Sequence, residues 1–295
     1  MITKELLYAA TKIECNVHQM YDCIALSNGE HPNSLAFFDD LAYLEQLNNN
    51  ANITGVMVAE EHQHLISKEK IIILTEDPRW VYFTVYNYLA EKNKINFETV
   101  IDESSKIHKT AYVADLNVII GKNCILHPNV TILEDVEIGD NCIIQAGSVI
   151  GSEGFEYKKT SKGILPVKHD GKVLIKNKVH IGANTCIDKG FSHLHTIIND
   201  CVMIDNLVHV AHGVQIGENS FIIAGTVLGG STIIENDVWV GINASTAPGI
   251  RLGNHSFVSM GAVVTKDVAN SSQVTGNFAI EHTAFLRSLK NKLNE

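Results

Sequence analysis

IGENSFIIAGTVLGGSTIIENDVWVGINASTAPGIRLG, residues 216–253, places an aliphatic side chain at almost every sixth position. The full series reads Ile198, Ile204, Val210, Ile216, Ile222, Leu228, Ile234, Val240, Thr246, Leu252, Val258 and Val264. A shorter series with the same spacing runs from Ile120 to Ile150. A short fixed period is the signature of a repeat architecture, in which each repeat buries its apolar face only against its neighbours.

A second set of small or β-branched residues lies four positions after each aliphatic one, from Val202 to Val268. Gly, Asn and Asp follow the aliphatic residue, as in IGKN, IGDN, IGAN and IGEN, and these residues favour turns and positive φ. Six residues make a short strand and a turn, not a helical repeat. The pattern predicts a β-helix with three walls, in which residue i stacks under residue i+18. Hexapeptide repeats of this kind resemble the left-handed parallel β-helix.

The fold class is therefore mainly β, with the left-handed parallel β-helix predicted over residues 105–276. Residues 1–104 lack the six-residue period and predict a small α/β domain. In that domain GVMVA and KIIILT are typical of buried strands, and Asp77-Pro78 is a helix-start signal. Residues 277–295 predict a C-terminal helix.

Two segments break the six-residue count. The longer, residues 153–171, is rich in charge, Gly and Pro and predicts a loop extruded from the β-helix. The shorter is KGFSHLH, residues 189–195. Loops that leave a rigid scaffold often carry functional residues, although they also simply tolerate insertion.

The 295-residue chain has a net charge of −10 at pH 7. Binding to nucleic-acid phosphates or anionic lipid requires clustered Lys and Arg, so neither partner is expected. No stretch predicts a membrane span, and the first residues lack the apolar run of a signal peptide. The six cysteines form no C-x-x-C pair, which favours reduced thiols. These features predict a cytoplasmic protein without membrane insertion.

Three stretches add a more specific signal: IGSEGFEY (150–157), IGANTCIDKG (181–190) and IDNLVHVAHGVQIGEN (204–219). They resemble segments of the UDP-3-O-acylglucosamine N-acyltransferase family of lipid A synthesis, which belongs to the left-handed β-helix acyltransferases. The order of an α/β domain, a β-helix and a C-terminal helix is similar as well. The resemblance implies an acyltransferase that works as a homotrimer, with active sites between neighbouring subunits.

The resemblance also implies roles for individual residues. The catalytic histidine of the family falls on His212, its supporting acid on Asp205, and the glycine whose amide binds the oxyanion on Gly230. The two aromatic residues that enclose the nucleotide base fall on Phe37 and Tyr43. On spacing alone these two aromatics predict ordinary packing; the resemblance favours nucleotide binding instead.

Residues 243–268, NASTAPGIRLGNHSFVSMGAVVTKDV, resemble a different group, the coenzyme-A-dependent sugar acetyltransferases. This second resemblance implies that Gly261, Ala262 and Lys266 contact coenzyme A. The predicted function is transfer of an acyl group from acyl-CoA to the amine of a UDP- or dTDP-linked amino sugar, in the synthesis of a surface polysaccharide. The alternative is acylation of a UDP-glucosamine lipid A precursor from acyl carrier protein.

The six-residue count separates the two histidines of HVAHGV. Gly230 lies 18 residues after His212, so the β-helix places it one coil further along the same face. No role is assigned to His209. A zinc-dependent hydratase of the carbonic anhydrase type is a third alternative, using nitrogen ligands from His193, His195, His209 and His212. Their spacings match no pattern of this kind, and no metal is predicted.

Overall fold

The computed structural model describes residues 1–295 except 18, 193, 277, 278, 280, 294 and 295. The chain divides into two compact units. Unit 1 comprises residues 1–97, 153–171 and 189–194, and unit 2 comprises residues 98–152, 172–188 and 195–295. Both segments that break the six-residue count thus contribute to unit 1.

Unit 1 contains a parallel sheet in the order β1-β2-β3-β4. Its strands are β1 (Cys23–Ile24), β2 (Ser34–Phe38), β3 (Ile53–Val58) and β4 (Ile71–Leu74). Its helical segments are α1 (Lys4–Thr11), η1 (Leu41–Tyr43), α2 (Leu44–Asn49), η2 (Glu60–Leu65) and α3 (Pro78–Lys92). The predicted α/β domain is confirmed. The predicted helix start holds too, because the Asp77 carboxylate caps α3 by accepting from the Trp80 N–H at 2.8 Å.

The longer excursion from the β-helix is a β-hairpin in unit 1. Its strands are β14 (Tyr157–Thr160) and β15 (Gly163–Pro166), which pair antiparallel. The side chain of Asn87 on α3 binds the backbone on either side of Val167, just after β15. Its Nδ2 donates to the Pro166 carbonyl and its Oδ1 accepts from the Lys168 N–H, each at 2.8 Å. Val167 is buried in the core of the unit. The hairpin is therefore an integral part of the α/β unit.

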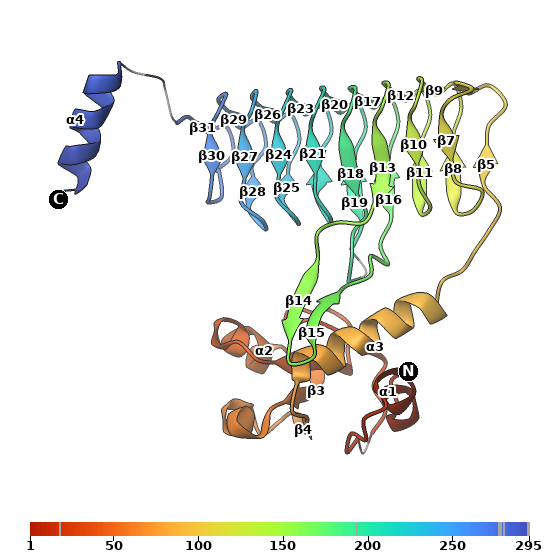
Figure 1. The fold of residues 1–295 in the computed structure, drawn as a ribbon, viewed down its shortest axis with the longest axis vertical. Coiled ribbons are helices and arrows are strands. Elements are labelled where there is room, and N and C mark those ends of the chain that lie inside the picture. The colour runs from red at the N-terminus through yellow and green to blue at the C-terminus, as the bar shows by residue number, and fades with distance from the viewer. Residues whose placement is uncertain (18, 193, 277–278, 280, 294–295) are drawn as a thin grey trace. The chain divides into compact units, whose positions relative to one another are not determined.

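The described strands of unit 2 form three parallel sheets, here called walls 1, 2 and 3 in the order in which the chain visits them. Wall 1 contains β5 (Val100–Ile101), β8 (Val118–Ile120), β11 (Val136–Ile138), β16 (Val173–Ile175), β19 (Thr196–Ile198), β22 (Gln215–Ile216), β25 (Ile233–Ile234) and β28 (Arg251–Leu252). Wall 2 contains β6 (Lys106–Ile107), β9 (Ile125–Leu126), β12 (Ile143–Ile144), β17 (His180–Ile181), β20 (Met203–Ile204), β23 (Phe221–Ile222), β26 (Trp239–Val240), β29 (Phe257–Val258) and β31 (Gln273–Val274). Wall 3 contains β7 (Tyr112–Val113), β10 (Thr131–Ile132), β13 (Val149–Ser152), β18 (Cys186–Asp188), β21 (His209–Val210), β24 (Val227–Leu228), β27 (Ser245–Thr246) and β30 (Val263–Val264). The coils stack side by side from yellow to blue in Figure 1, which confirms the predicted β-helix.

The corner between wall 3 and wall 1 is here called the 3/1 corner. Wherever the number of residues per coil changes among the paired strands, the residues are added or lost at this corner. Both excursions leave there, after Ser152 and after Asp188, and the chain then resumes wall 1 in register. The last turn at this corner is instead shorter. Val264 pairs with Thr246, 18 residues away, whereas Val268 bridges Leu252 at only 16.

The interior of the coil contains the two predicted series of side chains. The aliphatic series is buried throughout, and the second series is buried even where it is polar. The hydroxyls of Ser220 and Thr226 donate to the carbonyls of Glu235 and Gly241, at 3.0 and 3.1 Å. Small hydroxyl residues fit this narrow interior, and these two find a backbone acceptor in the next coil.

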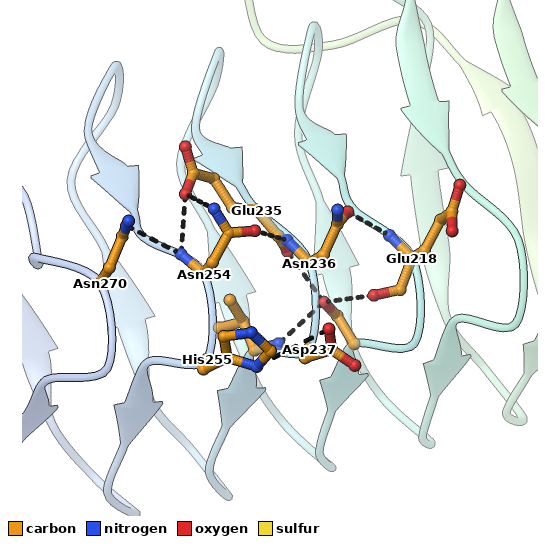
Figure 2. Close-up of polar contacts among 9 residues, drawn as sticks. Glu218, Glu235, Asn236, Asp237, Asn254, His255 and Asn270 are labelled. Carbon is orange, nitrogen blue, oxygen red and sulfur yellow. Dashed lines mark hydrogen bonds and ion pairs between the residues drawn. The ribbon is translucent and has the colours of Figure 1, made fainter.

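Asparagine side chains link successive coils at the corner between walls 1 and 2 (Figure 2). The Oδ1 of Asn236 accepts from the Glu218 N–H at 2.9 Å, and the Oδ1 of Asn254 accepts from the Asn236 N–H at 3.1 Å. Asn270 repeats the contact with the Asn254 N–H at 3.1 Å. These side chains satisfy corner N–H groups that the parallel strands leave unpaired.

Glycine precedes two of these corners, at Gly217 and Gly253, and Glu235 precedes the one between them. Gly217 shows why a residue without a side chain is needed there. A Cβ on Gly217 would lie 2.5 Å from the Asn236 Oδ1 and 2.5 Å from the Glu235 carbonyl carbon. The positive φ falls two residues later, on Asn219, at 58°. The expectation that both residue types serve positive φ is therefore correct for asparagine and wrong for the glycine of this motif.

Three aromatic rings form a column on the outer face of wall 2. Phe221, Trp239 and Phe257 are direct partners in neighbouring strands. Their ring centroids are 5.4 and 6.0 Å apart, and the rings are stacked. All three are exposed, so the column is a continuous apolar surface.

The chain ends in α4 (His282–Leu293), as predicted. None of the helices in the described residues is long and apolar enough to cross a membrane.

Replacing Gly217 with Ala should lower stability by about 1–3 kcal/mol, because the new methyl group displaces both the asparagine side chain and the backbone of the next coil. Thermal and urea unfolding would measure the effect. Gly276→Ala is the matched control, because a Cβ there has no neighbour within 4 Å. Equal unfolding midpoints for the two variants would contradict the spatial explanation.

Candidate functional site

His212 lies on the 3/1 corner, two residues after β21, and its side chain is partly exposed. The turn beneath it is fixed by hydrogen bonds. The Thr196 hydroxyl accepts from the Gly213 N–H at 2.9 Å and donates to the Asp188 carbonyl at 2.7 Å. Gly213 has a positive φ of 70°, which suits glycine at this tight turn. The backbone that carries the imidazole is therefore held rigidly.

Gly230 occupies the same corner one coil later, and the imidazole of His212 packs directly on it. A Cβ on Gly230 would lie 2.6 Å from His212 Cε1 and 2.7 Å from His212 Nε2. The backbones are also joined, since the Ser231 N–H donates to the His212 carbonyl at 2.8 Å. The 18-residue repeat predicts that Gly230 lies next to His212, and the structure shows the two in contact. Gly230 is buried beneath the imidazole ring.

Asp205 lies on a different corner, after β20 of wall 2. Its carboxylate accepts from the backbone N–H groups of Asn206, at 2.7 Å, and Ala224, at 3.2 Å. His212 follows a strand of wall 3. Within one chain the structure thus places Asp205 and His212 on separate corners of the coil.

Phe37 and Tyr43 line one cavity of about 350 Å³ in unit 1. Phe37 lies on β2 and is half-buried, with its ring 4.7 Å from the ring of Tyr82 between centroids. Tyr43 closes η1 and is 56% exposed. The Phe37 ring is therefore part of the core, whereas the Tyr43 ring is exposed at the rim of the cavity.

Charged groups complete this cavity, and no sequence motif indicated them. Arg79 at the start of α3 donates to both carboxylate oxygens of Asp39, at 2.6 and 3.1 Å. This hydrogen bonding raises the pKa of the Arg79 guanidinium. Lys158 of the hairpin also lines the cavity; its ammonium lies 4.7 Å from the centroid of the Phe83 ring and pairs with Glu156. Two cations and an aromatic pair therefore face the same space.

The residues assigned to coenzyme A lie on either side of β30. Gly261 precedes the strand with a φ of 67°, and Lys266 follows it and is exposed. Ala262 is buried inside the coil. Every position four after the aliphatic residue faces the narrow interior, which leaves only the backbone of Ala262 for a ligand.

Among the described residues, the other histidines of the zinc alternative do not converge with His212 on one site. His193 is outside the described residues. His195 Nδ1 accepts from the Lys172 N–H at 3.1 Å. His209 projects from wall 3 rather than from the corner, and its Nε2 lies 3.7 Å from an Asp188 carboxylate oxygen.

Comparison with known proteins identifies two hexapeptide-repeat matches within unit 2. Residues 117–152 match the family described as bacterial transferase hexapeptide (six repeats), and residues 231–266 match the hexapeptide repeat of succinyl-transferase. A structural relative, the UDP-N-acetylglucosamine acyltransferase of Arabidopsis, superposes with a TM-score of 0.48 at 21% identity, over 64% of this chain and 76% of the other.

Several curated relatives carry the name UDP-3-O-acylglucosamine N-acyltransferase. The Wolinella succinogenes protein is 34% identical over 177 residues, which span 59% of this chain and 55% of the relative. The Helicobacter pylori protein is 29% identical over 80% of this chain and 76% of its own length. The Rickettsia massiliae protein is 52% identical over 98 residues, or 28% of that relative. The chain thus matches about half the length of the first of these and less of the third. Together the repeat, the fold and these relatives confirm the predicted resemblance to the hexapeptide-repeat acyltransferases.

Proposed function

We propose that this protein is an N-acyltransferase that moves an acyl group from a thioester to the amine of a nucleotide-linked amino sugar. The observation that carries the proposal is the contact between the His212 imidazole and Gly230. This contact lies in a chain similar to enzymes named UDP-3-O-acylglucosamine N-acyltransferase. A base and a backbone amide side by side are the two groups that acyl transfer to an amine requires.

The chemistry follows from these two groups. The sugar amine attacks the thioester carbonyl carbon, and an imidazole nitrogen of His212 removes a proton from the attacking nitrogen. Histidine suits this step because its ordinary pKa lies near neutral pH. The N–H of Gly230 stabilises the oxyanion of the tetrahedral intermediate. Collapse breaks the carbon–sulfur bond, and the imidazolium returns its proton to the departing thiolate.

The 3/1 corner also suits a long thioester donor. His212, Gly230, Pro248 and Lys266 each follow a strand of wall 3 by two residues. Three rungs of roughly 4.7–4.9 Å separate the imidazole from the ammonium by about 14 Å along the coil axis. An extended pantetheine arm with its acyl end at His212 would run toward Lys266, which suits the phosphates of coenzyme A. Acyl carrier protein presents the same arm and is the alternative donor.

The cavity of unit 1 suits the nucleotide. A uracil or thymine base stacks between Phe37 and Tyr43, and the diphosphate faces Arg79 and Lys158. Both cations already carry a carboxylate partner, Arg79 with Asp39 and Lys158 with Glu156, so a diphosphate would share them with these acids.

Assembly into a homotrimer completes the proposal. Asp205 and His212 are on different corners of one chain, so Asp205 supports the imidazole only if it comes from a second copy. The exposed aromatic column of wall 2 is an apolar surface that a neighbouring subunit would cover.

Purified protein should form an N-acylated nucleotide sugar when offered acetyl-CoA or longer acyl-CoAs with UDP- and dTDP-linked amino sugars, with products identified by mass spectrometry. His212→Ala should lower this rate about 10²–10⁴-fold, because the amine then loses its proton acceptor. His255→Ala, an exposed histidine on the corner between walls 1 and 2, is the control and should be unaffected.

Product formed only from acyl carrier protein would favour the alternative donor. Absence of product from every donor would overturn the proposed activity. Near-normal turnover by His212→Ala would mean that the amine binds already deprotonated.

The contact between His212 and Gly230 should appear as energetic coupling. Gly230→Ala should destabilise the protein, because its methyl group displaces the imidazole. In a His212→Ala background, Gly230→Ala should lower the free energy of unfolding by at least about 1 kcal/mol less than it does in the wild type, since the ring is absent. Equal costs in the two backgrounds, measured by chemical unfolding, would contradict the packing of ring on glycine.

Tyr43→Ala should weaken binding of UDP or dTDP at least about fivefold, because stacking of a base on an aromatic ring is worth about 1–3 kcal/mol. Isothermal titration calorimetry measures this directly. Tyr8→Ala removes an exposed tyrosine from α1 of the same unit and serves as the control. An unchanged dissociation constant for Tyr43→Ala would place the nucleotide elsewhere.

A further inference from the structure

Wall 3 carries a cluster of polar side chains where the two excursions leave the coil. Cys186 on β18 and His209 on β21 are direct partners in neighbouring strands. Asp188, at the end of β18, is the last residue before the second excursion. Ser152, at the end of β13, is the last residue before the first. The β-helix thus brings these residues together on its outer face.

Three side chains of ligand type in this cluster lie close enough together to share one metal ion. His209 Nε2 lies 3.7 Å from Asp188 Oδ2, and Cys186 Sγ lies 3.6 Å from Asp188 Oδ1. One donor atom from each residue lies within 4.8 Å of the other two. Tetrahedral zinc with bonds of about 2.0–2.3 Å has ligand–ligand distances of roughly 3.3–3.8 Å. The two distances from Asp188 fall in this range but involve different carboxylate oxygens, so a small rotation of the side chains would bring three ligand atoms around one ion.

A second layer of contacts holds the carboxylate in place. Ser152 Oγ donates to Asp188 Oδ1 at 2.7 Å and lies 3.2 Å from Cys186 Sγ. A bulge between Ile150 and Ser152, with Gly151 at a φ of 92°, gives Ser152 this position. Hydrogen bonds of this kind orient metal ligands in proteins.

The burial of the cluster also favours a cation. The Asp188 side chain is only 7% exposed, and a buried carboxylate is costly without a compensating positive charge. The His209 side chain is 42% exposed, so the cluster is open on one side. Three protein ligands and an open position are the arrangement in which zinc keeps a water molecule.

We propose that Cys186, Asp188 and His209 bind one Zn²⁺ ion, with the fourth position open to water or a small ligand. A thiolate, an imidazole and a carboxylate together suit zinc better than Mg²⁺ or Ca²⁺, which prefer oxygen ligands. On binding, the Cys186 thiol releases its proton to solvent, and the two anionic ligands balance the charge of the ion. The ion joins β18 to β21 at the point where the second excursion begins.

None of the three proposed ligands is a proposed acyl-transfer residue, although the Asp188 carbonyl accepts from the Thr196 hydroxyl beneath the turn of His212. His209 lies on the wall, whereas His212 lies on the 3/1 corner. No metal-binding pattern is visible in the sequence because the interval between Asp188 and His209 includes the second excursion, whose length is unrelated to zinc binding.

Titration of tag-free, chelator-treated full-length protein with Zn²⁺ against a chromophoric competitor should give one equivalent bound per chain. Replacement by Co²⁺ should give a thiolate-to-cobalt charge-transfer band in the near ultraviolet. Cys186→Ala and His209→Gln should each weaken Zn²⁺ binding at least tenfold, and Cys186→Ala should abolish the charge-transfer band. Cys201→Ala and His180→Ala remove the same residue types outside the cluster and should bind as the wild type does.

Zinc should also raise the thermal midpoint of the wild type but not of His209→Gln, because only the folded wild-type site binds the ion. His209 is half-exposed, so its variant should fold even if Cys186→Ala does not; circular dichroism without metal checks this. Substoichiometric Zn²⁺ binding, or binding unchanged in His209→Gln, would overturn the site. Neither zinc binding nor thermal stability measures acyl transfer. A negative result for the zinc site would therefore not contradict the proposed acyltransferase activity, and absence of that activity would not contradict the zinc site.

Discussion

Unit 2 depends on the parallel stacking of coils at one repeated cross-section. Most of its strands are two residues long and have no stability alone; each is held by hydrogen bonds to the coils on either side. A constant cross-section leaves little freedom at the corners. Glycine is needed where the next coil approaches, asparagine where an N–H lacks a partner, and serine or threonine where the interior is narrow. The sequence pattern is the direct result of this packing.

The same constraint explains what the sequence could predict. A period in sequence becomes a distance in space when every coil has equal length, so the contact of His212 with Gly230 follows from counting residues. The hairpin of residues 153–171 was recognisable only as an interruption, because its packing on α3 depends on tertiary contacts such as those of Asn87. The proximity of Cys186 and His209 was hidden for a related reason, since an excursion of arbitrary length separates them.

The rigid coil also separates tasks among its surfaces. The interior is apolar, the 1/2 corner, between walls 1 and 2, is occupied by its own backbone–asparagine bonds, and the outer walls carry aromatic and polar side chains. A histidine fixed on such a scaffold needs no rearrangement before it acts, which is the condition under which a base or an oxyanion donor is most effective. The cost is that one chain cannot bring its own Asp205 to His212.

The 3/1 corner has a further consequence for how such a protein changes over time. A hairpin, a short loop and a truncated turn all occur there, and the strands on both sides keep their register. Whole segments can therefore be gained or lost at this edge without repacking the interior. His212 and Gly230 lie along the same edge. New recognition elements acquired by insertion would thus arise beside the proposed catalytic residues, so that specificity could diversify while the chemical groups stay fixed.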